Sequence, residues 1–285
     1  MISCSPIMQT TRRAFLTLAA LPVWADAIPL DAKQIPTRRA GRVETVFKSP
    51  GPKPNGLQAT QEGLWIMDQG NNRVYLVDYE DGRVLRDLPT EADRASGITY
   101  DGKALWLAST YNRELIQANA KTGKTIKKHF TPGAGVIYQR VGDAPPRSSP
   151  LIKNEPAPAA APSPQRPRPL NTTGTGAHGL EWRDGKLWVA VPPSRMVYRI
   201  DPDNWIVEAN FPTAGNRPHG IGWEGRFLWV TDSNLNAFDK HDSETGAIVE
   251  RIQLADSDPL PHGMTIWQGK LWYCDDVGIV CRMDL

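Results

Sequence analysis

Residues 219–232 read HGIGWEGRFLWVTD, and this stretch decides the fold because it is one copy of a repeat. Each copy opens with a residue that is followed by Gly, and the five opening residues are Asn55, Ser96, His178, His219 and His262. Ten residues after each opening residue comes a Trp preceded by Leu, and these are Trp65, Trp106, Trp188, Trp229 and Trp272. The chain is therefore built from a unit of about 41 residues.

The best-preserved unit, residues 219–254, predicts four short strands at 219–223, 227–231, 235–240 and 247–254. Tight turns at Gly225 and Gly246 separate them, and no window outside the N-terminus has a helical apolar period. Four strands in about 41 residues, with Gly and aromatic markers, are typical of a blade of a β-propeller. The predicted fold is an all-β propeller of about five four-stranded blades.

The two ends of the chain predict how the ring closes. The last repeat stops after its third strand, at Leu285, while residues 42–47 (RVETVF) form an extra segment of the fourth-strand type. We therefore expect this N-terminal strand to complete the last blade, which removes a free sheet edge.

One interval departs from the repeat. Residues 131–176 lack the Gly and Leu-Trp markers and contain a Pro-rich run at 156–169. Proline cannot donate to a strand ladder, so we interpret 131–176 as an insertion within a single propeller domain, residues 28–285. The alternative to an insertion is a degenerate sixth blade. The insertion itself could fold over the channel mouth as a lid that contacts substrate through Tyr138, Arg140 and Arg147, or it could be a flexible surface loop.

Composition excludes several classes of protein. The 285 residues carry a net charge of +2, which argues against nucleic acid as the main partner. Three cysteines are too few for a disulfide scaffold, and no apolar run reaches the roughly 18 residues of a membrane span. Ten Trp, 24 Gly and 25 Pro fit many short strands joined by turns.

The N-terminus predicts export. Residues 10–27 contain Arg12-Arg13, a short apolar stretch and small residues at Ala25 and Ala27, which resembles a Tat signal peptide with a cleavage site. We therefore expect residues 1–27 to be a signal, the Tat translocon to be a partner during export, and the mature protein to be periplasmic or secreted by a bacterium. The alternative is a frayed N-terminal helix.

The opening residues are the first candidates for chemistry. The first strand of each blade lines the central channel of a propeller, so Asn55, Ser96 and the three histidines should ring one channel mouth. His178, His219 and His262 are three of only five histidines in the chain, and three neutral imidazoles are a common zinc ligand set. We predict a divalent metal, zinc foremost, at these histidines, with Asn55, Ser96 and Tyr138 binding ligand. The alternatives are a polar channel lining and a packing role.

A second set follows thirteen residues later. Asp68, Asp232 and Asp275 occupy it in three repeats, with Asp276 adjacent to the last. These carboxylates are candidates for general acid or base, or for orienting the histidines. The alternative is that each stabilises the following turn through backbone hydrogen bonds.

Cys274 and Cys281 flank the predicted final hairpin. Directly opposite each other, they would form a cross-strand disulfide in an oxidising compartment. The alternative is two buried free thiols.

Three motifs carry family resemblances. Residues 68–78 (DQGNNRVYLVD) resemble the NHL-type repeat, and the Pro-His-Gly and Leu-Trp-Val-Thr-Asp elements of 218–232 resemble virginiamycin B lyases, also called streptogramin lyases. The propeller is also similar to that of peptidyl-hydroxyglycine amidating lyases, which implies zinc at His178, His219 and His262. Glutamine cyclotransferases resemble the chain in blade count and length.

The sequence therefore predicts an exported propeller enzyme, a metal-assisted lyase or hydrolase acting on a small molecule or peptide at a His-lined channel mouth. The alternative is a non-catalytic propeller that binds a ligand or protein on the same face. A quinoprotein-like function is a weaker third interpretation, because no cofactor motif is visible.

Overall fold

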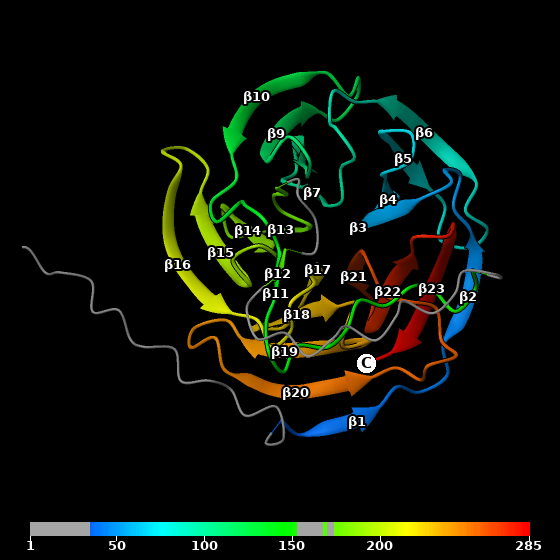
Figure 1. Ribbon diagram of the computed structural model, residues 1–285. Helices are drawn as coiled ribbons and strands as arrows, with labels where there is room; N and C mark the ends of the chain where they lie inside the picture. The colour runs from blue at the N-terminus through cyan, green and yellow to red at the C-terminus, as the bar shows by residue number, and fades with distance from the viewer. Residues whose placement is uncertain (1–34, 153–167, 170–173) are drawn as a thin grey trace, which may run out of the picture.

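A computed structural model describes residues 35–152, 168–169 and 174–285. In these residues the regular elements are all strands, and five sheets stand around a common axis as the blades of a β-propeller (Figure 1). The predicted all-β fold with five four-stranded blades is confirmed. No helix in the described ranges is long and apolar enough to cross a membrane. The expected export signal and most of the Pro-rich run lie outside these ranges, so that the domain division remains a prediction.

The first three blades each take four consecutive strands. The first consists of β3 (Pro54–Thr60), β4 (Gly63–Asp68), β5 (Arg73–Val77) and β6 (Val84–Pro89). The second consists of β7 (Ile98–Tyr100), β8 (Ala104–Ser109), β9 (Glu114–Asn119) and β10 (Thr125–Phe130). The third consists of β13 (Gly179–Arg183), β14 (Lys186–Val191), β15 (Met196–Asp201) and β16 (Ile206–Pro212).

The last two blades include the N-terminal strands. The fourth contains β17 (Pro218–Glu224), β18 (Phe227–Asp232), β19 (Ala237–Asp242) and β20 (Ile248–Gln253), with β1 (Thr37–Arg39) added in parallel outside β20. The fifth contains β21 (Met264–Trp267), β22 (Lys270–Asp275), β23 (Ile279–Asp284) and β2 (Glu44–Lys48). Since β2 pairs antiparallel with β23, the predicted closure is confirmed. The sequence analysis did not anticipate β1.

The repeat glycines let the inner strands crowd around the axis. A Cβ atom on Gly179 would overlap the carbonyl group of His219 in the next blade. One on Gly263 would overlap the backbone of Asn55, across the closure of the ring. Because glycine has no Cβ, adjacent inner strands approach closely, and the residues just before the glycines are brought together at one mouth of the channel.

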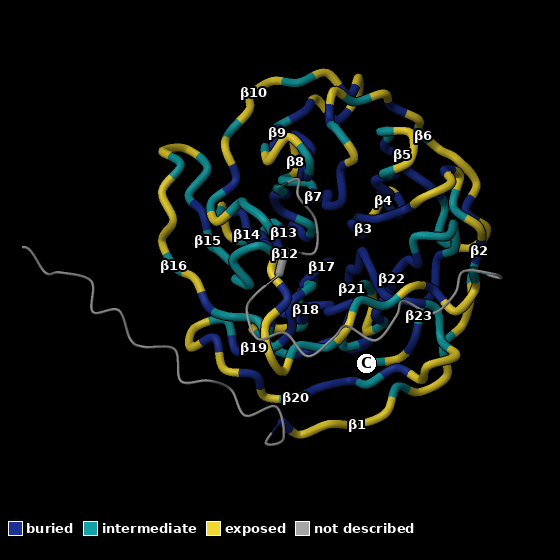
Figure 2. Tube along the Cα trace, in the orientation of Figure 1, coloured by how far each residue is buried: buried dark blue, intermediate teal, exposed yellow. Residues whose placement is uncertain are grey.

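The core lies between blades rather than in one centre. Five apolar clusters fill the five interfaces, and the outermost strands are the exposed ones (Figure 2). The repeated Trp of each blade packs against its neighbour: Trp106 stacks on Trp182 with ring centroids 6.3 Å apart, and Trp188 meets Trp223 at 5.0 Å. These indole rings fill the gap between diverging sheets, as a large aromatic does in a core.

The final hairpin corrects the disulfide expectation. Cys281 lies opposite Tyr273, and Cys274 lies opposite Val280. Positions one residue out of register point to opposite faces of a sheet, so the two sulfur atoms enter different inter-blade clusters. Both cysteines are free and buried, which is the second of the two alternatives.

The described N-terminal part of the insertion crosses the channel mouth. Residues 131–152, here called the strap, run in front of the ring and contain β11 (Tyr138–Gln139), which pairs with β12 (Arg168–Pro169) (Figure 1). Four strap residues bond to the propeller through Asp143–Arg195, Gln139–Asn216, Arg147–Asn234 and Ser149–Asp275. The two Asp143–Arg195 bonds are each 2.7 Å long, so this end of the strap is firmly held.

Candidate functional site

The lead residues, defined as the residues before the five repeat glycines, meet at the channel mouth as expected. The rings of His178 and His219 have centroids 4.6 Å apart, and those of His219 and His262 are 4.7 Å apart, both edge to face. His219 and His262 are buried, and His178 is half-buried. The three histidines thus form one continuous arc on the third, fourth and fifth blades.

Hydrogen bonds give this arc a direction. His219 Nδ1 lies 3.0 Å from the carbonyl oxygen of Arg217, which can only accept, so Nδ1 carries the proton. His219 Nε2 then accepts from His178 Nδ1, 3.1 Å away. His178 Nε2 is left unprotonated, and it is a buried atom with no hydrogen-bond partner among the described residues.

All three histidines are neutral at pH 7. Burial, with help from the charge of Arg217, lowers the pKa of His178 to about 3. Burial and the neighbouring histidines hold the pKa of His219 well below its ordinary value. Burial also lowers the pKa of His262 to about 4, although Asp276 acts in the opposite direction. Neutral imidazole is the form that accepts a proton or binds a metal.

The three-histidine metal site does not fit this geometry. A shared ion needs one free nitrogen from each ring, but both nitrogens of His219 are engaged, one with Arg217 and one with His178. His178 and His219 are therefore joined by a hydrogen bond, and His262 packs edge to face against His219.

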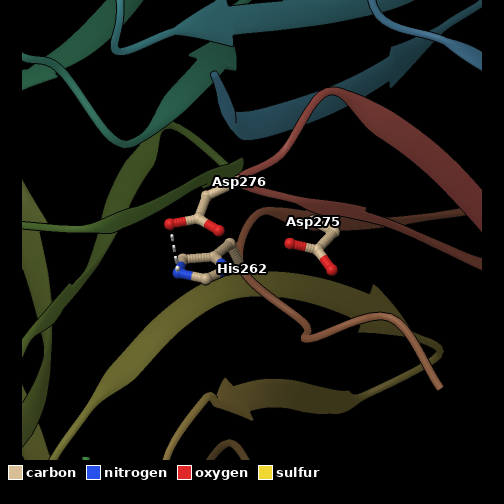
Figure 3. Close-up of side chains that lie close together, drawn as sticks. All are labelled: His262, Asp275 and Asp276. Atoms are coloured by element: carbon tan, nitrogen blue, oxygen red, sulfur yellow. Dashed lines mark ion pairs between the residues drawn. The ribbon is translucent and has the colours of Figure 1, made fainter. Parts of the chain in front are cut away.

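A second arrangement of ligand atoms does converge. Within the described ranges, His262, Asp275 and Asp276 offer one ligand atom each, all within 4.8 Å of one another (Figure 3). His262 Nε2 is 3.7 Å from an oxygen of Asp276. One nitrogen and two carboxylate oxygens are a donor set that suits a divalent cation.

The two carboxyl groups differ in protonation. Burial raises the pKa of Asp275 to about 7, and the charge of Asp276 adds to this. Burial also works to raise the pKa of Asp276, but the charge of His262 and a hydrogen bond from Asp275 outweigh it and leave the pKa lowered. Asp275 therefore keeps its proton to a higher pH than Asp276, and Asp276 is the member of the pair that ionises first.

The predicted catalytic aspartates have mainly architectural contacts. Asp68 accepts from the backbone N–H of Lys53 at 2.7 Å, and Asp232 accepts from that of Arg217 at 2.9 Å. Asp275 makes the equivalent bond to Leu260 N–H at 2.8 Å. Each carboxylate thus holds the segment two residues before a lead residue. Asp68 and Asp232 take the backbone role that was the alternative, and only Asp275 also borders the ligand cluster.

A pocket of about 280 Å³ opens beside the histidine arc. Its walls combine strap and propeller residues, namely Tyr111, Ile137, Pro146, Thr175, His178, Asn216, Arg217 and Asn234. Two wall amides are fixed in a chain: Asn234 donates to Asn216 at 2.8 Å and accepts from the Arg147 N–H of the strap. The strap therefore forms a fixed roof, which favours the lid over the flexible-loop alternative for this part of the insertion.

Arg217 is the charged group of the pocket. Its guanidinium donates to the carbonyl oxygen of Arg147 at 3.2 Å and lies 3.4 Å from His262 Nε2. It forms no ion pair with a carboxylate in the described part of the chain, unlike Arg195, which is paired with Asp143, and Arg251, which is paired with Asp239. An unpaired guanidinium on a pocket wall attracts an anionic group.

The predicted ligand-binding residues lie elsewhere. Asn55 is buried, and its Oδ1 has no partner among the described residues. Ser96 is buried and accepts from Gln69 at 3.1 Å. Tyr138 is 46% exposed, because side chains alternate along the extended strap and its neighbour Ile137 faces the pocket. None of the three residues lines this pocket, and their role in binding ligand stays a prediction.

Sequence reasoning missed Arg217, Asn216 and Asn234. A signal for Arg217 existed, because a basic residue also stands two positions before the lead residue in Lys53 and Arg94. The amides gave no such signal, since their positions depend on how the strap folds over the mouth.

Comparisons with known proteins bear on the fold. No protein family matches the chain in a scan of family profiles, and no curated protein is detectably similar in sequence. Among solved structures, glutaminyl cyclase from Myxococcus xanthus is 10% identical, covers 87% of this chain and 97% of its own, and has a TM-score of 0.55.

Two lyase structures resemble the chain more loosely. Inactive virginiamycin B lyase from Staphylococcus aureus, solved with quinupristin, is 18% identical over 81% of this chain and 66% of its own, with a TM-score of 0.46. A streptogramin B lyase is 15% identical, covers 86% of this chain and 98% of its own, and has the same TM-score. At these identities the similarity to the cyclase supports the β-propeller fold, and activity has to be argued from the site itself.

Proposed function

We propose that this protein is an exported enzyme, a metal-assisted lyase or hydrolase that acts on a small molecule or peptide in the channel-mouth pocket. The metal is a divalent cation, zinc foremost, and its ligands are His262, Asp275 and Asp276 rather than the three histidines of the arc. The alternative is a propeller that binds the same kind of ligand without catalysis.

One observation carries the proposal. His262 Nδ1 faces the carbonyl oxygen of Leu260 at 3.4 Å and so carries the proton, which leaves a lone pair on Nε2. That lone pair lies 3.7 Å from an oxygen of Asp276, and Asp275 Oδ1 is buried without a hydrogen-bond partner among the described residues. Lone pairs that face one another across such a gap are stabilised by a shared cation.

The residues of the chain divide the remaining work. When bound, a divalent ion supplies Lewis acidity at a substrate oxygen. His178 lines the channel-mouth pocket, and the proposed metal ligands adjoin that pocket through the contact between Arg217 and His262 Nε2. His178 Nε2 accepts a proton from substrate there, while its Nδ1–H stays bonded to His219. The Arg217 guanidinium stabilises the negative charge that develops on substrate, in a site that the strap shields from water.

Export is a separate part of the proposal. It rests on Arg12-Arg13 and the small residues Ala25 and Ala27. Replacing both arginines by lysine should leave uncleaved protein inside the cell, whereas the unaltered chain should appear outside the cytoplasm without residues 1–27. Mass spectrometry of cell fractions distinguishes the two.

Turnover tests the enzymatic part. The panel consists of aryl esters, lactones, quinupristin and a peptide with N-terminal glutamine, with EDTA-treated protein alongside. We expect turnover of at least one compound, with losses of about 100-fold or more in His262→Ala and Asp276→Asn. Asp81→Asn, at an exposed position far from the mouth, is the matched control and should keep full activity. Turnover that survives in both site variants would contradict the proposal.

A further inference from the structure

Three polar groups on the pocket wall lack a matching partner among the described residues, namely His178 Nε2, Thr175 Oγ1 and the Arg217 guanidinium. The Thr175 hydroxyl group can donate or accept, so the two specific demands, which together describe a ligand, come from the other two groups. This inference rests on the proposed function in using the same pocket, and it names the class of molecule that binds there. The first demand comes from His178 and the second from Arg217.

His178 Nε2 requires a hydrogen-bond donor. The Arg217 carbonyl oxygen fixes the proton on His219 Nδ1, and this fixes the proton of His178 on Nδ1. Ser233 cannot reverse this order, because its hydroxyl hydrogen is committed to the carbonyl oxygen of Pro261 at 2.6 Å. His178 Nε2 is therefore an acceptor, buried and unpartnered among the described residues, and an O–H or N–H group of a ligand satisfies it by taking the place of a water molecule.

Arg217 requires an anion. Its two contacts are to neutral acceptors, the Arg147 carbonyl oxygen and His262 Nε2. No described carboxylate pairs with it, and the planar guanidinium is suited to two parallel bonds with a carboxylate. An ammonium donor for His178 would add a second positive charge beside Arg217, so that the donor is a neutral group, and a hydroxyl group is the smallest such donor.

We propose that the channel-mouth pocket binds a hydroxycarboxylate, with its carboxylate on Arg217 and its hydroxyl group donating to His178 Nε2. The remaining walls combine an apolar side, formed by Ile137, Pro146 and Tyr111, with the polar residues Thr175, Asn216 and Asn234, around a space of about 280 Å³. This accommodates a hydrocarbon or aryl group on the hydroxycarboxylate. The hydroxyl proton on His178 is also the one that the proposed chemistry removes.

Three matched probes separate the two demands. Mandelate carries both groups, phenylacetate lacks the hydroxyl group, and mandelamide lacks the charge. Dissociation constants are measured by titration calorimetry on the protein as purified. We expect mandelate to bind about tenfold tighter than either partner, because each lost interaction leaves a buried group unsatisfied.

Variants assign each preference to its residue. His178→Ala should abolish the preference for mandelate over phenylacetate while retaining the preference over mandelamide. Arg217→Gln should abolish the preference for mandelate over mandelamide while retaining the preference over phenylacetate. His129→Ala, which removes a histidine stacked on Trp205 away from the mouth, should bind all three probes as the unaltered chain does. Circular dichroism checks that each variant is folded.

Two results would overturn the inference: phenylacetate binding as tightly as mandelate, or no saturable binding of mandelate. Because no turnover is measured, a non-catalytic protein would still rank the three probes as expected. Conversely, metal-dependent turnover without this ranking would remove the hydroxycarboxylate inference and leave the proposed function standing.

Discussion

The first two blades and the last three follow one repeat, yet the histidines and the His262–Asp275–Asp276 cluster of the candidate site all belong to the last three. The residue fourteen positions after the lead residue illustrates the difference. In the first blade it is Gln69, which donates to Ser96 of the next blade, and in the fourth it is Ser233, which donates to Pro261. In the fifth it is Asp276, which instead lies beside His262 of its own blade.

This contrast separates architecture from function. Asp68 in the first blade and Asp232 in the fourth make the same backbone contacts, so their shared presence reflects folding. The lead residues differ: Asn55 and Ser96 are buried, whereas His178 faces a pocket. A repeated residue thus indicates structure, and a departure from the repeat indicates the site.

The largest expected effect concerns the repeated Trp. Trp65→Ala and Trp229→Ala should each lower the free energy of unfolding by about 3–5 kcal/mol, because both rings are nearly fully buried between blades. Urea unfolding followed by far-UV circular dichroism measures this. A much smaller loss in the histidine-bearing part would show that the two regions are not equivalent in packing.

The repeated aspartates come next. Asp68→Ala and Asp232→Ala should each cost about 2–3 kcal/mol, since each leaves buried backbone N–H groups without an acceptor. The same unfolding assay applies, with exposed Asp81→Ala as the control. If Asp232→Ala were fully stable but inactive, its carboxylate would belong to the catalytic machinery after all.

Glu181, three residues after the lead residue of the third blade, should make the free energy of unfolding depend on pH. Burial raises the pKa of Glu181 to about 8, whereas the first blade carries the neutral Gln58 at the same repeat position. The stability that protonated Glu181 contributes is full below pH 4.5 and is lost as pH rises through 8. Glu181→Gln should therefore come close to the stability of the unaltered chain at pH 5 and exceed it by about 4 kcal/mol at pH 8.5. Exposed Glu62→Gln should show no such divergence, and equal pH profiles for all three proteins would contradict the account.

His178→Asn gives the third blade the lead residue of the first. Because His178 is half-buried and contributes one hydrogen bond to the arc, stability should change by about 1 kcal/mol or less. Turnover should fall by about 100-fold. A variant that kept its activity would show that the arc lines the channel without acting on substrate.

The smallest effect concerns the cysteines. Because Cys274 and Cys281 point into different clusters, reductant should leave the thermal midpoint unchanged within error. A fall of several degrees on adding dithiothreitol would reveal a disulfide and a different register for the last hairpin.

The repeat made the fold predictable, because a fixed spacing of Gly and Leu-Trp reports inner strands and inter-blade packing directly. It also placed the three histidines at one mouth. It could not show that their nitrogens bond to one another, because ring orientation depends on the Arg217 carbonyl group. The pocket could not be predicted from the repeat either, because the strap forms one of its walls and has no counterpart in the repeat.

Metal content tests the central claim most directly. Protein purified without chelators or a histidine tag is measured by elemental analysis, together with Asp276→Asn and His178→Asn. The account predicts about one equivalent of a divalent metal in the unaltered chain and in His178→Asn, and its loss in Asp276→Asn. A metal-free unaltered protein, or metal lost with His178 and retained without Asp276, would contradict it.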